Sequence, residues 1–204
     1  MKKHVLLLLA IMFGITGCSK SNETAKPKEE SNTERYVLSD DFIKAKVDSV
    51  HDGDSIFVTY DVDGEPYSKE LYLAGIDAPE LIHPIYKEMP FGKEAKENLE
   101  KVIKESGDIY IETNEDEKTS TSGRIIGYAY ANYDGELIQL NEMQVSQGLA
   151  RVTDNLENVV DITILQENYD KLTESEKKAK SEKLNIWGRE NFVSDKGYDE
   201  KYKK

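Results

Sequence analysis

Two acidic segments and one arginine carry the residue types that can act on a phosphate ester. Asp52-Gly53-Asp54 stands at the entrance of a predicted strand, where the glycine lets the backbone turn sharply and approach a ligand. Asp77 and Glu80 flank Ala78-Pro79 at the end of a later strand, and the proline stops that strand. Carboxylates gathered from separate strands can hold a hard cation, and Arg124 can pair with a phosphate through two parallel hydrogen bonds.

Each feature also has an ordinary structural explanation. Asp-Gly pairs are mostly turns, and Asp77 and Glu80 can be solvated loop residues. An isolated arginine such as Arg124 is more often a surface charge than a ligand. His83 precedes a proline and has no second histidine or cysteine close to it in sequence, which favours a loop residue over a metal ligand. Taken one by one, these features do not decide a function.

The hydrophobic pattern indicates which elements would position these residues. Alternation of apolar and polar residues predicts five short strands, at 42–50, 56–62, 67–76, 108–112 and 124–133. Asp63-Gly64 accepts the positive φ angles of a tight hairpin between the second and third strands, and 114–123 is expected to be a polar loop.

Helical spacing predicts three helices: 92–106, ended by Gly107; 141–147, capped by Asn141; and one carrying apolar residues from Ile162 to Ala179. Short strands with interleaved helices favour an α+β fold on a five-stranded, OB-fold-like Greek-key β-barrel with three helices.

The first 18 residues have the pattern of a lipoprotein export signal. Lys2 and Lys3 precede an apolar run that ends at Ile15-Thr16-Gly17-Cys18. The run is shorter than the roughly 20 residues that a membrane-spanning helix needs. The last four residues resemble a lipobox, in which the cysteine receives a diacylglyceryl group, and two acyl chains suffice for stable anchoring. We therefore expect a signal peptide at 1–17 and a lipid on Cys18 that holds the protein on the extracellular face of the cell membrane. The alternatives are a membrane span and a secreted protein with a chance cysteine.

Polar segments flank the predicted globular domain at 41–190. Within 18–40, the chain is too poor in apolar residues to offset the cost of ordering, which predicts a flexible linker. Residues 191–204 are expected to be a charged, frayed tail. The net charge is −13, or about −15 without residues 1–17. This disfavours nucleic-acid binding through a broad basic surface, although a metal ion and a few local cations can govern one cleft.

Several motifs occur in one order along residues 42–188. They are Asp52-Gly53-Asp54, Gly75-Ile76-Asp77-Ala78-Pro79-Glu80, His83-Pro84, Gly92 with Glu94-Ala95, Gly123-Arg124 before Tyr128-Ala129-Tyr130, Gln147-Gly148-Leu149-Ala150 and Lys183-Leu184-Asn185-Ile186-Trp187. In this order and spacing they resemble the staphylococcal nuclease family. The resemblance implies a five-stranded barrel packed with three helices and calcium-dependent hydrolysis of phosphodiester bonds in DNA and RNA.

The resemblance also implies roles for individual residues. Asp54 and Asp77 would ligate Ca²⁺ together with the backbone carbonyl of Ala78. Glu80 would position or deprotonate the attacking water, and Arg124 would stabilise charge in the transition state. The expected partners are a DNA or RNA substrate and, through the lipid on Cys18, the membrane; the chain is expected to be a monomer.

Several positions depart from the family pattern. Ala78 stands where the family usually has threonine. Tyr72 stands where active members place a second phosphate-binding arginine, and a phenol cannot make a bidentate, charged pair. Lys69 cannot replace that arginine, because an odd offset along a strand points to the opposite face. Ser120-Thr121-Ser122 replaces aromatic and basic residues, and Asp154 lies near where an aromatic would contact the nucleotide.

The sequence therefore predicts a surface-tethered, calcium-dependent nuclease with reduced or altered efficiency. One alternative is a catalytically weakened nuclease-fold module that binds nucleotide, nucleic acid or a protein partner. Another is a structural envelope lipoprotein without a ligand. The four retained residues Asp54, Asp77, Glu80 and Arg124 favour the enzyme; Tyr72, the serine-rich loop and the negative charge favour its rivals.

Overall fold

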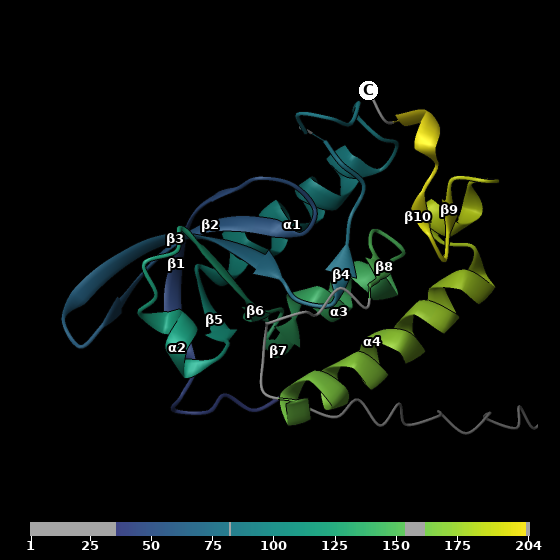
Figure 1. The fold of residues 1–204 in the computed structure, drawn as a ribbon. Coiled ribbons are helices and arrows are strands. Elements are labelled where there is room, and N and C mark those ends of the chain that lie inside the picture. Colours follow the sequence, from purple (N-terminus) through teal and green to yellow (C-terminus); the bar gives the residue numbers. More distant parts are fainter. Residues whose placement is uncertain (1–35, 82, 154–161, 203–204) are drawn as a thin grey trace, which may run out of the picture. The chain divides into compact units, whose positions relative to one another are not determined.

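The computed structural model describes residues 36–81, 83–153 and 162–202 (Figure 1). The chain divides into two units, 1–33 and 34–204, and the first lies entirely outside the described residues. The predicted signal peptide, Cys18, most of the linker and Asp154 therefore fall outside them as well. In the part of the chain that is described, no helix is long and apolar enough to cross a membrane.

A closed barrel of five strands forms the centre of the second unit. Its strands are β1 (Ile43–Val50), β2 (Ser55–Val62), β3 (Glu65–Leu73), β5 (Asp108–Glu112) and β6 (Arg124–Tyr133). They are ordered β3-β2-β1-β5-β6, and a parallel pairing of β3 with β6 closes the barrel (Figure 1). A further strand, β7 (Glu136–Gln139), extends from β6. The predicted OB-fold-like α+β barrel is confirmed.

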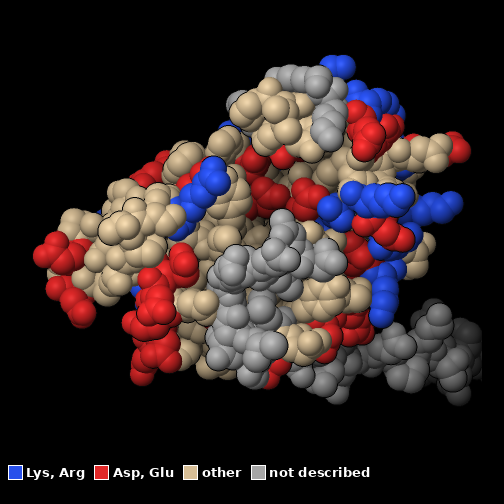
Figure 2. Space-filling model, in the orientation of Figure 1, with Lys and Arg blue, Asp and Glu red and all other residues tan. Residues whose placement is uncertain are grey.

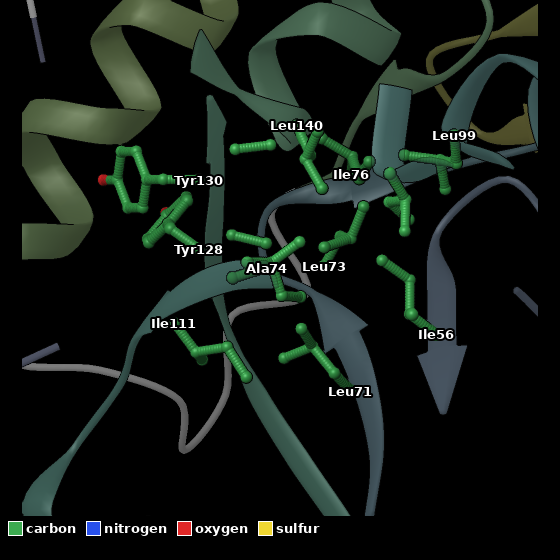
Figure 3. Close-up of a cluster of buried hydrophobic side chains, with 14 of the residues drawn as sticks. Ile56, Leu71, Leu73, Ala74, Ile76, Leu99, Ile111, Tyr128, Tyr130 and Leu140 are labelled. Atoms are coloured by element: carbon green, nitrogen blue, oxygen red, sulfur yellow. The ribbon is translucent and has the colours of Figure 1, made fainter. Parts of the chain in front are cut away.

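The interior of the barrel is filled by branched aliphatic and aromatic side chains (Figure 3). On β2, Ile56, Val58 and Tyr60 are buried, and Phe57 between the first two is exposed, as the alternating pattern predicts. The β2–β3 hairpin turns at Asp63 and Gly64, whose φ angles are 55° and 86°. The predicted tight turn is therefore confirmed at these two residues.

Helices cover the barrel. They are α1 (Gly92–Ser106), α2 (Glu115–Lys118), α3 (Leu140–Ser146), α4 (Ile162–Glu182) and the 3₁₀ turn η1 (Asn185–Gly188). Helix α1 has the predicted bounds, buries Ala95, Leu99 and Val102, and ends at Gly107, whose φ is 81°. Helix α2 lies inside the segment expected to be a loop.

The predicted capping role of Asn141 is wrong. Asn141 lies inside α3 and is fully buried. Its Oδ1 accepts the Ala129 N–H at 3.0 Å, and its Nδ2 donates to the Ala74 carbonyl at 2.8 Å. A short polar residue before an apolar run looks like a cap in sequence, but here it ties β6 to the end of β3.

The strand predicted at 67–76 is two strands. β3 ends at Leu73, and Gly75, with φ of 75°, turns the chain into β4 (Ile76–Asp77), which pairs with β8 (Arg151–Val152). Asp77 therefore lies outside the barrel sheet and opposite Arg151.

The C-terminal segment is not a frayed tail. It forms β9 (Val193–Ser194), β10 (Gly197–Tyr198) and a short 3₁₀ turn, η2 (Glu200–Tyr202). Phe192 is fully buried in a small cluster with Met89 and Ile186. The expectation failed because the abundant charges conceal Tyr198 and Tyr202, whose rings both pack against Phe192.

Candidate active site

The turn between β1 and β2 is held by its own side chains. One carboxylate oxygen of Asp52 accepts the Asp54 N–H at 3.2 Å and the Ser55 hydroxyl at 2.6 Å. Side-chain acceptance of backbone N–H groups two residues on is the usual way in which aspartate fixes a turn. These hydrogen bonds hold the turn that carries Asp54.

Gly53 packs this turn closely against its surroundings. A Cβ at this position would lie 2.5 Å from the Cβ of Ala95 on α1 and 2.6 Å from the Cβ of Ala78. The buried Gln144 donates to the Gly53 carbonyl at 2.7 Å and to the Ala95 carbonyl at 2.9 Å. The glycine is needed for this close approach, which brings the turn against the segment that carries Asp77 and Ala78.

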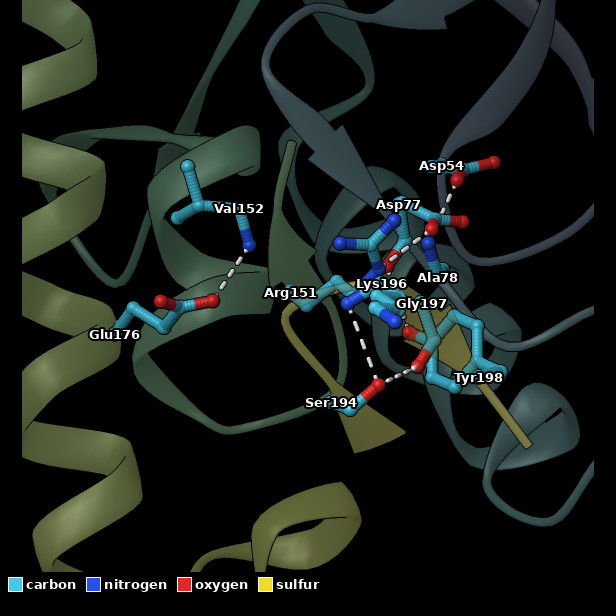
Figure 4. A network of polar contacts seen from close by, with 10 residues as sticks. All are labelled: Asp54, Asp77, Ala78, Arg151, Val152, Glu176, Ser194, Lys196, Gly197 and Tyr198. Atoms are coloured by element: carbon cyan, nitrogen blue, oxygen red, sulfur yellow. Dashed lines mark hydrogen bonds and ion pairs between the residues drawn. The ribbon is translucent and has the colours of Figure 1, made fainter. Parts of the chain in front are cut away.

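The three residues predicted to ligate a metal meet in this region (Figure 4). The Ala78 N–H donates to one carboxylate oxygen of Asp54 at 2.7 Å. The register of β4 and β8 places Asp77 opposite Arg151, whose Nε donates to one carboxylate oxygen of Asp77 at 2.7 Å. One oxygen of each carboxylate is thus engaged, and the second oxygen of each is the potential ligand.

The carboxylates of this site disfavour one another's ionisation. Burial raises the pKa of Asp54 well above its usual value, and the neighbouring Asp52 and Asp77 add to the effect. Burial also raises the pKa of Asp77, against the opposing influence of Arg151. The pKa of Glu80 rises to about 7 through burial and the proximity of Asp52 and Asp77. Figure 2 shows acidic side chains in a recess, with basic groups to either side.

These residues fit a hard divalent cation. Asp54 and Asp77 offer carboxylate oxygens where negative charge is crowded, which is the condition that a bound cation would relieve. No three His, Cys, Asp or Glu side chains among the described residues are arranged to hold an ion by themselves. Calcium takes about six to eight oxygen ligands. The site therefore fits an open arrangement in which the Ala78 carbonyl, water or substrate would supply the remaining oxygens.

Arg124 faces a different environment. The parallel register of β3 and β6 sets Arg124 beside Glu70, and its Nε lies 3.5 Å from a carboxylate oxygen of Glu70. The same oxygen accepts the Tyr72 hydroxyl at 3.2 Å, and the other lies 2.9 Å from Nδ1 of His51. The guanidinium carbon of Arg124 lies 5.1 Å from the centre of the Tyr72 ring. Tyr72 thus occupies the space beside Arg124 without adding a positive charge.

Lys69 points away from this group, as the strand periodicity predicts. Its Nζ donates to the Glu117 carbonyl and to the Ser120 hydroxyl, each at 2.9 Å. The side chain is almost fully buried, and burial lowers its pKa. Lys69 therefore anchors the 114–123 segment and does not replace the missing arginine.

Four residues that the sequence analysis did not select belong to this region: His51, Glu70, Arg151 and Tyr198. Alternation along β3 is a signal that could have revealed Glu70, since it stands two residues before Tyr72 and shares its face. No local pattern indicates Arg151 or Tyr198, whose positions depend on pairings across the fold. His83, as expected, is a loop residue, with its Nδ1 3.2 Å from the Ile85 N–H.

Known proteins resemble the chain over this whole region. The family described as staphylococcal nuclease homologue matches residues 70–189. Endonuclease YncB of Bacillus subtilis is 27% identical over 225 residues that cover 98% of each protein. The SPbeta prophage-derived endonuclease YokF of the same organism is 30% identical over 162 residues, which are 78% of this chain but about half (49%) of YokF. A thermonuclease of Staphylococcus hyicus is 29% identical over 145 residues, covering 70% of this chain and 74% of that protein.

The family match spans more than half of the chain and includes Tyr72, Asp77, Glu80 and Arg124. It begins after Asp54 and after β1 and β2, and it covers the motifs from Gly75 onward. The chain belongs to the staphylococcal nuclease family.

Proposed function

We propose that this protein is a calcium-dependent nuclease that hydrolyses phosphodiester bonds in DNA, RNA or both, with reduced or altered efficiency. The observation that carries the proposal is that Asp54, from the β1–β2 turn, lies beside the segment that carries Asp77 and Glu80, which forms one crowded acidic site. The endonuclease names of YncB and YokF support the reaction class.

Glu80 is suited to act as the general base. Without a bound cation the pKa of Glu80 is about 7, and such a carboxyl group can both take and release a proton near neutral pH, which is the condition for efficient proton transfer. Its charged form is disfavoured by burial and by Asp52 and Asp77, so it gains basicity relative to an ordinary glutamate. We therefore propose that Glu80 accepts the proton of the attacking water.

Arg124 is suited to bind the phosphate. Its side chain is 68% exposed, so a substrate oxygen can reach the guanidinium. Asp54, Asp77 and the Ala78 carbonyl would hold the calcium ion, which when bound would supply Lewis-acid polarisation of a phosphate oxygen. Phosphoryl transfer depends mainly on positioning and charge stabilisation, and Arg124 supplies the charge from this chain.

The arginine side of the site accounts for the reduced efficiency. Tyr72 offers a single neutral donor, and burial and Glu70 raise its pKa. Loss of one positioned donor to a developing negative charge typically costs roughly 10²- to 10³-fold in rate. The wild-type enzyme is therefore expected to be slow but measurable.

A second candidate function is a nuclease-fold module that binds nucleic acid, nucleotide or a protein partner without efficient cleavage. The contact of Arg124 with Glu70 favours it, since this carboxylate partly neutralises the phosphate-facing cation. The net charge of −13 disfavours tight nucleic-acid binding through a broad surface, so among the partners of such a module it favours a nucleotide or a protein.

Incubation of purified residues 19–204 with DNA and with RNA, in calcium and in chelator, separates the two candidates. We expect slow cleavage that requires calcium. The control is Asp77→Asn, which should lose both cleavage and calcium binding. A well-folded wild type that binds calcium but cleaves neither polymer would favour the binding module.

We further propose that Cys18 carries a diacylglyceryl group that anchors the protein on the extracellular face of the membrane. The support is the basic, apolar and small-residue order of the first 18 residues. Metabolic labelling with a radioactive fatty acid should mark the wild type and not Cys18→Ser. Absence of label on the wild type, in cells with intact lipoprotein processing, would disprove the anchor.

A further inference from the structure

The C-terminal segment 191–202, which we call the C-terminal clamp, touches the polypeptide that carries the acidic site. It lies beyond the residues matched by the family, 70–189. The hydroxyl of Tyr198 donates to the backbone carbonyl of Asp77 at 2.7 Å. The Tyr202 carbonyl accepts the Lys87 N–H at 2.7 Å. The clamp therefore contacts the chain on both sides of Glu80.

An apolar cluster of its own holds the clamp in place. Phe192 is fully buried, and its ring centre lies 5.9 Å from that of Phe91, 5.3 Å from that of Tyr198 and 5.7 Å from that of Tyr202. The other buried members are Met89 and Ile186, and the cluster is separate from the barrel core. Loss of this cluster should therefore loosen the clamp without unfolding the barrel.

The cluster is linked to Glu80 through the backbone. Met89 packs in the cluster, and its N–H donates to the Glu80 carbonyl at 2.8 Å. Gly92, at the start of α1, packs on the same turn, since a Cβ there would lie 2.8 Å from the Pro79 carbonyl oxygen. The turn that carries Glu80 is thus enclosed between α1 and the clamp.

The clamp also supports the ion pair of Asp77 (Figure 4). Arg151 donates from Nε to the Asp77 carboxylate at 2.7 Å, and its guanidinium carbon lies 5.9 Å from the centre of the Tyr198 ring. Gly197, with φ of 117°, brings the hairpin close, since a Cβ there would lie 3.6 Å from Nη2 of Arg151. Tyr198 therefore contacts Asp77 directly and through Arg151.

We propose that the C-terminal clamp is a working part of the active site and that Tyr198 is a positioning residue for Asp77 and Glu80. Its hydroxyl fixes the Asp77 backbone and its ring confines Arg151, so the free carboxylate oxygen of Asp77 is presented in one orientation. Small displacements of a catalytic group reduce rates strongly. The catalytic consequence rests on the proposed nuclease function, whereas the structural consequence does not.

The test compares full-length wild type in detergent with Tyr198→Phe, which removes only the hydroxyl. Hydrogen exchange is measured without calcium, and calcium affinity is measured by calorimetry. We expect faster exchange over residues 76–91, about fivefold weaker calcium binding, and a kcat about fivefold lower with KM unchanged. The matched control is Tyr67→Phe, which alters a β3 tyrosine stacked on Tyr60, and should change none of these values.

A second variant, Phe192→Ala, tests the apolar anchor. Hydrogen exchange should become faster over both residues 191–202 and residues 76–91, while the amides of β1 and β2 remain protected from exchange. The proposal is overturned if Tyr198→Phe and Phe192→Ala both leave exchange over 76–91 and calcium affinity at wild-type values. If exchange and affinity change as expected while the wild type cleaves neither DNA nor RNA, the clamp is supported and the nuclease proposal fails.

Discussion

The two halves of the candidate active site differ in how firmly they are held. On the carboxylate side, the Ala78 N–H holds Asp54, and Arg151, whose side chain is only 16% exposed, holds Asp77. The arginine side, Arg124 with Tyr72 and Glu70, lies where β3 pairs with β6. The Arg124 side chain is 68% exposed, and its Nε lies 3.5 Å from Glu70.

This difference shows where the site can change at little cost to the fold. An altered carboxylate would disturb buried bonds and leave a partner such as Arg151 without its counter-charge, which is strongly destabilising. An altered residue beside Arg124 disturbs a 3.5 Å ion pair whose arginine is 68% exposed, and a pair of this kind contributes little to stability. We infer that substrate contacts can diverge while the carboxylate side stays intact, as Tyr72 illustrates.

The largest effect should come from the carboxylate side. Glu80→Gln removes the proposed base but keeps the shape of the side chain, so kcat should fall by roughly 10²- to 10⁴-fold. Steady-state cleavage assays measure the loss, and calcium calorimetry serves as the control because the two predicted carboxylate ligands remain. An activity within threefold of wild type would show that Glu80 is not the base.

Arg124→Ala should have the next largest effect, a decrease of roughly 10²- to 10³-fold in kcat/KM. Stability should change little, since the side chain is exposed. Arg124→Lys is the informative companion, because a lysine keeps the charge but loses the bidentate geometry. Full activity in Arg124→Lys would mean that charge alone matters on this side.

An arginine at position 72 should strengthen phosphate binding on the arginine side of the site. Tyr72→Arg should raise calcium-dependent cleavage at least about tenfold, because a second charged donor would face the phosphate. Thermal stability and calcium affinity must be measured beside the rate, since the ring of Tyr72 packs against Arg124. A wild type as fast as typical family enzymes would show that another residue already supplies this charge.

The raised pKa values on the carboxylate side should make the stability of the folded protein depend on pH. The folded-state pKa of Glu80 is about 7 against an ordinary value of 4.5, so the native state binds the proton more tightly. The resulting stabilisation is complete below about pH 4.5 and is lost as the pH rises through 7. The raised pKa values of Asp54 and Asp77 act in the same direction.

Without calcium, the melting temperature should therefore fall by roughly 2–4 °C between pH 5 and 8 from this source. Differential scanning calorimetry measures the fall. Calcium should reverse it at pH 8, because the ion favours the ionised carboxylates. In Glu80→Gln the fall should be smaller, and an unchanged slope would mean that Glu80 does not carry the shift.

The sequence predicted the barrel because strand alternation is a local pattern, and it selected Asp54 and Asp77, which the structure brings close to Ala78. Strand alternation correctly predicted that Ile56 and Val58 are buried, and the Asp63-Gly64 pair correctly predicted the β2–β3 turn. The sequence could not predict contacts that depend on pairings between distant segments. Arg151 meets Asp77 only because β8 pairs with β4, 74 residues away.

The C-terminal clamp was missed for a compositional reason. Charged residues around Phe192 and Tyr198 resemble a solvated tail, and only the cluster with Met89 gives these rings a buried environment. Cys18 and the linker lie outside the described residues, so the lipid anchor stays a prediction.

The smallest effect should come from Glu70, whose carboxylate lies beside Arg124. Its carboxylate is 3.5 Å from Arg124, and a substrate phosphate must compete with it for the guanidinium. The pair is long and its arginine is exposed, so it contributes roughly 0.2–1 kcal/mol, and Glu70→Gln should lower KM by about two- to fivefold and leave kcat nearly unchanged. Glu112→Gln is the control, since Glu112 accepts the Tyr130 hydroxyl outside the site. If Glu70→Gln instead raises KM, the carboxylate must hold Arg124 in the orientation that binds phosphate, and Glu70 would then be a support for substrate binding rather than a competitor.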